Sequence, residues 1–240
     1  YPSVWMSEIQ PQGRDLSALR AAFEMYTALR RLGLDVDIVA PEADLTGYRL
    51  IAVPMLLDAD AALAAKLAAS GAQVLIGPRS GSKTRDFQIP PSMAPGALQV
   101  LLPLTVTRVE SLRRGASVGV SIDGVAHNVT RWREWLRTDL TPRARFTDGG
   151  GAWFSHGKAH YLAGWPEPAM LRTVLRALTE AAGIATTDMA DGVRWRRRGG
   201  LCLAINYAAE HRPAHAPAGA KFVIGGPDLP PAGIAAWRLA

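Results

Sequence analysis

Apolar and polar positions along the first 54 residues predict a β-α-β unit. An apolar run over residues 3–9 predicts a strand, and residues 14–32 predict a helix. Apolar side chains recur at steps of three and four in that helix, which places on one face Leu16, Leu19, Phe23, Tyr26, Leu29 and Leu32. Two further apolar runs, over residues 36–40 and 50–54, predict two more strands. Because a crossover helix joins parallel neighbours, this order predicts an α/β fold with a parallel sheet.

The pattern continues with a second helix and another strand. Asp58 is placed to cap a helix whose packing face comprises Ala61, Leu63, Ala64, Leu67 and Ala68. Residues 73–76 predict a strand, and residues 77–95 form a long irregular segment with a charged centre. A segment of that length is usually either functional or mobile. A short helical turn is expected over residues 97–101.

Beyond that turn the pattern favours strands. They are expected at residues 104–109, 117–122, 125–137, 143–146 and 159–164. Residues 167–182 return to a helical period, and only short alternating runs follow, at residues 193–197, 201–207, 221–224 and 234–239. This change of pattern predicts two domains: an α/β domain over residues 1–186 and a small antiparallel β domain over residues 187–240.

Composition narrows the class of protein. The 240 residues are 48% hydrophobic and include 23 Gly and 17 Pro, which is typical of a globular chain with many turns. The formal net charge of +6 permits nucleic-acid binding, but the basic run over residues 194–198 falls on a predicted strand. Its side chains would point alternately to opposite sides, so we expect no nucleic-acid partner.

Cysteine content and hydropathy bear on location. The single cysteine, Cys202, excludes an internal disulfide framework and favours a reducing compartment, so a cytoplasmic location is expected. No run of 18 apolar residues occurs, and the first residues lack the pattern of a secretory signal, so no membrane contact is expected. The chain starts without methionine and enters its first predicted strand almost at once, which suggests an excised piece of a longer protein.

The segment after residue 76 resembles a phosphate-binding loop only superficially. It reads GPRSGSKT over residues 77–84, with three residues between its glycines and Ser82 where a P-loop has lysine. A proline-broken segment follows where a helix would be required. We therefore interpret the turn around Arg79 as a surface loop and expect no nucleotide cofactor.

Candidates for catalysis and metal binding are equally weak. No Gly-x-Cys/Ser-x-Gly turn follows a predicted strand, and Cys202 lies on an apolar strand, where it is expected to be buried. His211 and His215 are four residues apart, but Pro213 between them breaks the helix that would align them; the other histidines are His127, His156 and His160. No pair of carboxylates is prominent. The sequence thus predicts no catalytic, cofactor-binding or metal-binding residues.

Several ordered strings resemble one known family along nearly the whole chain. They are residues 7–12 (SEIQPQ), 26–39 (YTALRRLGLDVDIV), 44–48 (DLTGY), 78–81 (PRSG), 146–151, 157–162 (GKAHYL), 203–207 and 233–237 (GIAAW). Together they resemble the non-catalytic region of the glycoside hydrolase family 42 β-galactosidases. In that family an N-terminal (β/α)8 barrel carries both catalytic glutamates. A flavodoxin-like or class I amidotransferase-like trimerisation domain follows, and a small β domain ends the chain.

This resemblance implies a scaffold and not an enzyme. It implies a mostly parallel sheet flanked by helices, a homotrimer formed through the α/β domain, and hydrolysis of terminal β-D-galactosides in a barrel that this chain lacks. Two different surface patches should then be apolar. We expect them in the loop at residues 83–93 and around Trp132, Trp135 and Trp153.

Two other function classes remain open. One is a small-molecule or carbohydrate-binding module whose crevice lies at the carboxyl ends of the parallel strands, lined by the loops after Pro54 and Gly77. The other is an independent amidotransferase-like enzyme, which the missing nucleophile turn disfavours.

Overall fold

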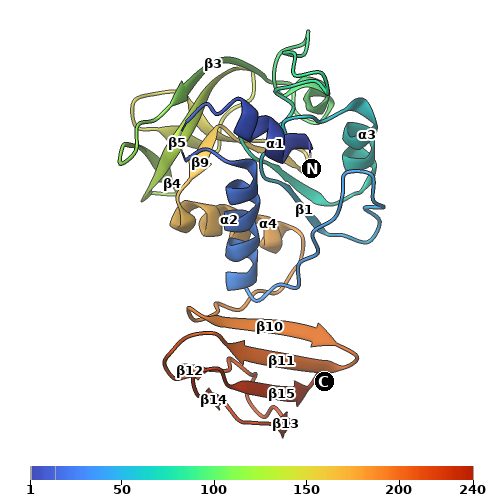
Figure 1. Ribbon diagram of the computed structural model, residues 1–240, viewed down its shortest axis with the longest axis vertical. Coiled ribbons are helices and arrows are strands. Elements are labelled where there is room, and N and C mark those ends of the chain that lie inside the picture. Colours follow the sequence, from blue (N-terminus) through green and yellow to red (C-terminus); the bar gives the residue numbers. More distant parts are fainter. Residues whose placement is uncertain (1, 14, 240) are drawn as a thin grey trace. The chain divides into compact units, whose positions relative to one another are not determined.

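The structure is a computed structural model that describes residues 2–13 and 15–239, and it comprises two compact units (Figure 1). The first unit contains Tyr1–Met25 and Val39–Ile184, and the second contains Tyr26–Ile38 and Ala185–Ala240. The boundary passes through helix α2 (Ala18–Arg31), whose first half belongs to the first unit and whose second half belongs to the second.

A nine-stranded mixed sheet forms the centre of the first unit. Eight strands follow the order β1-β2-β8-β7-β6-β4-β5-β3, and β9 pairs with β5. Their bounds are β1 (Leu50–Val53), β2 (Gln73–Ile76), β3 (Thr105–Ser111), β4 (Ser117–Ile122), β5 (Val125–Arg137), β6 (Ala144–Phe146), β7 (Gly151–His156), β8 (Ala159–Leu162) and β9 (Gly164–Pro166).

The expectation of a mostly parallel sheet is wrong. Strand β2 pairs in parallel with β1 and β8, and the remaining pairings are antiparallel. Short turns explain the difference, since antiparallel neighbours need no crossover helix. Asp123 and Gly124, both with positive φ, join β4 to β5 as the two-residue turn that a hairpin favours.

The helices of the first unit are α1 (Pro2–Ile9), the first half of α2, α3 (Ala61–Ala69) and α4 (Pro168–Ala181), with a 3₁₀ turn η1 (Gly96–Val100). Helix α4 contacts β5 and β9 through its apolar face. Asp60, and not the predicted Asp58, caps α3, because its Oδ1 accepts a hydrogen bond from the Leu63 N–H at 2.8 Å. No helix in the described part of the chain has the length and apolar content of a membrane span.

The predicted β-α-β unit at the start of the chain does not form. Residues 3–9 belong to helix α1, where Ser7 Oγ donates to the Val4 carbonyl at 2.7 Å. A short apolar run fits a helix as well as a strand, so this prediction was wrong for lack of a distinguishing period. Residues 36–40 form no strand either, and Ile38 is 82% exposed. The parallel β-α-β unit comes one step later, as β1, α3 and β2.

Helix α2 is confirmed, but its predicted core face is only partly correct. Leu16, just before the helix, and Leu29 are buried as expected, whereas Leu19 and Phe23 are 62% and 65% exposed. Other apolar side chains take the core positions instead, namely Ala18, Met25 and Ala28. The sequence of this helix therefore carries two apolar stripes, and its period does not reveal which one faces the core. Arg14, where the predicted helix begins, lies outside the described residues.

Tryptophans of the first unit belong mainly to its core. Trp132 packs in one buried cluster with Trp165 and with Met6, Leu16, Ala18, Met55 and Leu57. Trp153 is also 2% exposed, so Trp132 and Trp153 are core side chains and not the surface contacts that we expected. Trp135 is half-buried, with the guanidinium of Arg108 at 4.2 Å from its ring centre.

The second unit contains a four-stranded antiparallel sheet, as the sequence predicts. Its order is β10-β11-β15-β13, with bounds β10 (Val193–Arg198), β11 (Leu201–Asn206), β13 (Phe222–Ile224) and β15 (Ile234–Arg238). Strands β12 (Arg212–Pro213) and β14 (Asp228–Leu229) form a separate pair. Trp237 packs edge-on against Trp195 and Phe222 in the core, and Cys202 is fully buried beside them, as expected.

Candidate functional site

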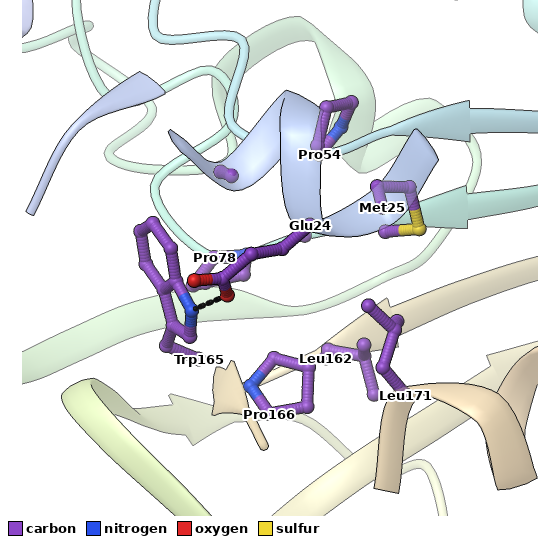
Figure 2. Close-up of a pocket in the computed structure, with 10 residues that line it drawn as sticks. Glu24, Met25, Pro54, Pro78, Leu162, Trp165, Pro166 and Leu171 are labelled. Carbon is purple, nitrogen blue, oxygen red and sulfur yellow. Dashed lines mark hydrogen bonds between the residues drawn. The ribbon is translucent and has the colours of Figure 1, made fainter. Parts of the chain in front are cut away.

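A small pocket lies at the carboxyl ends of the parallel strands β1, β2 and β8 (Figure 2). This is the edge where the sequence predicted a crevice, and Pro54 and Gly77 line the pocket as expected. The other lining residues come from α2, the strand ends and α4: Ala21, Glu24, Met25, Pro78, Leu162, Trp165, Pro166 and Leu171. The parallel-strand rule therefore located the pocket correctly.

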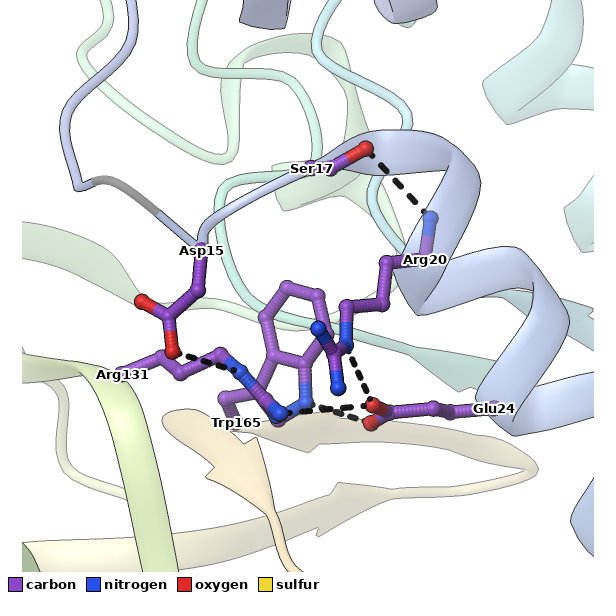
Figure 3. Close-up of polar contacts among 6 residues, drawn as sticks. All are labelled: Asp15, Ser17, Arg20, Glu24, Arg131 and Trp165. Atoms are coloured by element: carbon purple, nitrogen blue, oxygen red, sulfur yellow. Dashed lines mark hydrogen bonds and ion pairs between the residues drawn. The ribbon is translucent and has the colours of Figure 1, made fainter. Parts of the chain in front are cut away.

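The polar side of this pocket is a closed network of charges (Figure 3). Glu24 accepts a hydrogen bond from Trp165 Nε1 at 2.7 Å and one from Arg20 Nε at 3.0 Å. Arg131 lies 3.5 Å from the Glu24 carboxylate, pairs with Asp15 at 3.3 Å, and stacks at 4.9 Å over the Trp165 ring. Because both Glu24 oxygens have donors and two arginines lie beside two carboxylates, the Glu24 side chain is fixed in place by its neighbours.

The pocket is too small for a sugar ring. Its volume of about 320 Å³ includes the solvent at its mouth, and only about 20 Å³ of it admits the centre of a water molecule. That space corresponds to roughly one bound water. The carbohydrate-binding alternative therefore lacks room at the place where the sequence located it.

The turn that follows β2 is buried, which corrects the interpretation of a surface loop. Arg79 is 4% exposed and adopts a left-handed φ of 64°. Its backbone N–H donates to Glu134 Oε1 at 2.9 Å, and its guanidinium lies 5.1 Å from the Trp132 ring centre. A strained, left-handed residue in the turn that follows a parallel strand matches the position of a nucleophile in the turn of hydrolases. Here an arginine that contributes to the core takes that position.

Glu134 is the centre of a buried polar cluster that the sequence did not predict. Its Oε2 accepts a hydrogen bond from the Tyr161 hydroxyl at 2.6 Å, and its Oε1 accepts one from Trp132 Nε1 at 2.9 Å. Burial raises the pKa of the Glu134 carboxyl, while these hydrogen bonds and nearby Arg79 oppose the rise. Strand period offered only a partial signal, since Trp132 and Glu134 share a face of β5 but Arg133 on the opposite face is buried as well.

A second polar ladder crosses three neighbouring strands. His160 on β8 accepts the Ser155 hydroxyl at Nδ1 (2.8 Å) and donates from Nε2 to Gln73 Oε1 (2.9 Å). Ser155 and His160 are directly opposite each other in the β7–β8 pairing, so the arrangement follows from strand register. Burial, and secondarily the Arg143 charge, lower the pKa of His160 to about 4. The neutral imidazole therefore links the three neighbouring strands β2, β8 and β7.

We expect His160 to make the first unit less stable in mild acid. The imidazole pKa is depressed in the folded chain, so protons bind the unfolded state preferentially between about pH 6.5 and 4. Its contribution is complete above pH 6.5 and falls by roughly 2 kcal/mol as the pH approaches 4. Urea unfolding at pH 7 and pH 4.5 measures this. His160→Gln should remove most of the difference between the free energies of unfolding at the two pH values; a difference as large as that of the unchanged chain would contradict the assignment.

The second unit has a wider pocket of about 550 Å³, which again includes solvent at its mouth. Its lining residues are Thr187, Trp195, Arg197, Cys202, His215, Pro217, Trp237 and Leu239. Burial raises the pKa of the Cys202 thiol to about 11, so this sulfur is a protonated and unreactive group at neutral pH. Within residues 2–13 and 15–239, no group of three or more His, Cys, Asp or Glu side chains is placed to hold a metal ion.

These observations describe an α/β module in which the charged groups stabilise the fold. The family model described as the β-galactosidase trimerisation domain matches residues 1–185, and the chain belongs to this family, within glycoside hydrolase family 42. The resemblance stated from the sequence is thereby confirmed. This match identifies the family and does not by itself assign the domain to the flavodoxin-like or amidotransferase-like folds.

Known relatives are β-galactosidases that are much longer than this chain. It is 46% identical to β-galactosidase BgaA of Thermus sp. and 44% identical to a β-galactosidase of Thermus thermophilus, in both cases over 100% of this chain and 37% of the relative. Among solved structures, a β-galactosidase of the psychrophilic Marinomonas ef1 aligns with TM-score 0.94 and 35% identity over 99% of this chain and 36% of the other. A β-galactosidase of Halorubrum lacusprofundi aligns with TM-score 0.86 and 29% identity over 98% and 38%. The chain thus spans little more than a third of these relatives.

Proposed function

We propose that this chain is the self-association and scaffold region of a β-galactosidase, and that it forms a homotrimer. The observation that carries the proposal is the match of residues 1–185 to the trimerisation-domain family. In the same proposal, hydrolysis of terminal β-D-galactosides belongs to an N-terminal (β/α)8 barrel outside these 240 residues. That barrel would also be the chain's partner within one polypeptide.

The state of the buried and pocket carboxylates supports a non-catalytic role. Retaining glycoside hydrolysis needs two carboxyl groups about 5 Å apart beside a sugar, one free to donate a proton and one free to attack. Glu24 at the pocket accepts hydrogen bonds at both oxygens, and so does Glu134 in the core. We therefore assign no catalytic, cofactor-binding or metal-binding residue to this chain.

The finer description of the fold belongs to the same proposal. A flavodoxin-like or class I amidotransferase-like origin is supported by the parallel strands β1, β2 and β8 and by the left-handed Arg79 in the turn after β2. A domain division at residues 186 and 187 is supported by the end of the family match at residue 185 and by the separate sheet that follows. The single cysteine supports a cytoplasmic location.

We expect the 240-residue chain to have a mass of about 77 kDa in solution at micromolar concentration, which is three times 25.7 kDa. Light scattering after gel filtration measures this mass. A mass of 25.7 kDa at that concentration would contradict self-association by this chain. In a parallel assay with a chromogenic β-galactoside, we expect no turnover; hydrolysis at ordinary enzymatic rates would overturn the non-catalytic assignment.

A further inference from the structure

Two helices at the start of the first unit expose large apolar side chains. Leu19 and Phe23 lie one turn apart on α2, and Trp5 and Ile9 lie one turn apart on α1. Their exposed fractions are between 45% and 65%. Ser7 Oγ accepts a hydrogen bond from the Ala18 N–H at 3.3 Å, so the two helices are tied together. We refer to Trp5, Ile9, Leu19 and Phe23 as the helical patch.

An apolar patch of this kind marks an interaction surface. Single exposed leucines are ordinary, whereas four large apolar side chains exposed on two adjacent helices form a candidate interaction surface. The sequence pattern agrees, because Leu19 and Phe23 were predicted on the same helical face as the buried Leu29 and yet are 62% and 65% exposed. Their hydrophobic side chains are therefore available for burial by another surface.

The match of residues 1–185 to a trimerisation-domain family points to a second copy of this chain as that surface, and the charges beside the helical patch permit it. The chain carries a net charge of +6, so two copies repel each other unless they meet where local charge is balanced. On α2, Arg20 and Glu24 pair at 3.0 Å directly beside Leu19 and Phe23. The exposed face of α2 therefore has apolar side chains at its centre and an ion pair without net charge at its edge.

A second apolar surface lies on the long segment between β2 and β3. Ile89, Met93 and Val100 are 64%, 45% and 70% exposed, and we refer to them as the loop patch. Gln99 Nε2 donates to the Ser92 and Met93 carbonyls at 2.7 and 3.3 Å, which fixes this segment to η1. The loop at residues 83–93 is also where the sequence led us to expect an interface.

We propose that the helical patch of one copy packs against the loop patch of the next copy. This inference rests on the homotrimer proposed above and identifies its contact surfaces. A ring of three copies uses heterologous contacts, in which each subunit presents two different patches. Both patches fall within the residues that match the trimerisation-domain family, and both belong to the first unit.

The first test removes one patch at a time. We expect the double variant Leu19→Ser, Phe23→Ser and, separately, the double variant Ile89→Ser, Val100→Ser to shift the mass from about 77 kDa to that of one chain, 25.7 kDa. Val125→Ser is the matched control, since Val125 is 56% exposed on the β4–β5 turn and belongs to neither patch. It should retain the trimer. Circular dichroism melting curves should show that all three variants fold.

The second test mixes the two monomeric variants. The chain with the intact helical patch and the chain with the intact loop patch still share one complementary contact, so the mixture should form a heterodimer of about 51 kDa, twice 25.7 kDa. Folded patch variants that remain trimeric would overturn the assignment of surfaces and leave the trimer itself intact. A mixture that remains monomeric would overturn the pairing of the two patches. A monomeric wild-type chain would overturn the proposed trimer and this inference together.

Discussion

Replacing Glu134 with alanine is expected to lower the melting temperature of the first unit by about 10 °C. The carboxylate is the acceptor for the Tyr161 hydroxyl, the Trp132 indole and the Arg79 backbone N–H. All three groups donate to it, which is the arrangement that an ionised carboxylate requires. Without it, the Arg79 guanidinium, 4% exposed, becomes a buried charge without its compensating anion. Such a loss typically costs about 3–5 kcal/mol of folding free energy. In a domain of this size each kcal/mol lowers the melting temperature by about 2–4 °C.

The matched control for this variant is Glu110→Ala. Glu110 also pairs with an arginine of β5, accepting from Arg133 Nε at 2.5 Å, but its side chain is 37% exposed. Because Glu110 is partly exposed and Arg133 keeps a second partner, Asp148 at 2.6 Å, this control should cost only about 0–1 kcal/mol and shift the melting temperature by no more than a few degrees. Thermal melting followed by circular dichroism compares the two variants. Equal shifts in both would show that burial of Glu134 does not determine its contribution.

Local sequence patterns predicted the elements whose partners are close in the chain. Strands β4 and β5 were predicted with their observed bounds, and the Asp123-Gly124 turn that joins them is local to the chain. The strands of the terminal sheet were also predicted, because glycine turns separate runs with a period of two. Strand β7 was missed, because Gly151–His156 carries no alternation that sets it apart from the glycine turn before it.

The errors fall where tertiary partners decide the outcome. Helix α1 was taken for a strand, since eight apolar-rich residues fit either period. For α2, the pattern located the helix correctly but could not show which of two apolar stripes faces the core. If Leu19 and Phe23 pack against a second copy, these two positions are apolar because they are buried in an interface between subunits and not in the core of one subunit.

The pocket at the strand ends and the Glu134 cluster also differ in how far the sequence could predict them. The pocket edge was predictable, because the carboxyl ends of parallel strands meet at one edge regardless of side chains. The Glu134 cluster was not, because Arg79 and Tyr161 lie 55 and 27 residues from it in sequence. A buried carboxylate is recognisable only once its donors are known, and those donors come from two strands and a turn.

The close approach of two backbone segments leads to the second large effect. We expect Gly81→Ala to destabilise the first unit by about 4 kcal/mol. Gly81 has a φ of +63°, and a Cβ atom there would lie 1.9 Å from the Pro95 carbonyl oxygen and 2.6 Å from its carbon. Both are backbone atoms, so no side-chain rotation relieves the overlap and the two segments must separate. Urea unfolding monitored by tryptophan fluorescence measures the loss.

Gly157→Ala separates the effect of overlap from that of backbone conformation. Gly157 lies in the β7–β8 turn with a φ of +56°, and a Cβ atom there meets nothing within 4 Å. Its substitution carries only the left-handed penalty of roughly 1–2 kcal/mol. Because residues 81 and 95 hold the base of the segment that carries Ile89 and Met93, Gly81→Ala should also weaken self-association, whereas Gly157→Ala should not. Equal losses of stability in both variants would show that the segments around residues 81 and 95 separate without cost. A Gly81→Ala chain that is destabilised yet fully trimeric would show that the loop patch does not depend on the contact between these two segments.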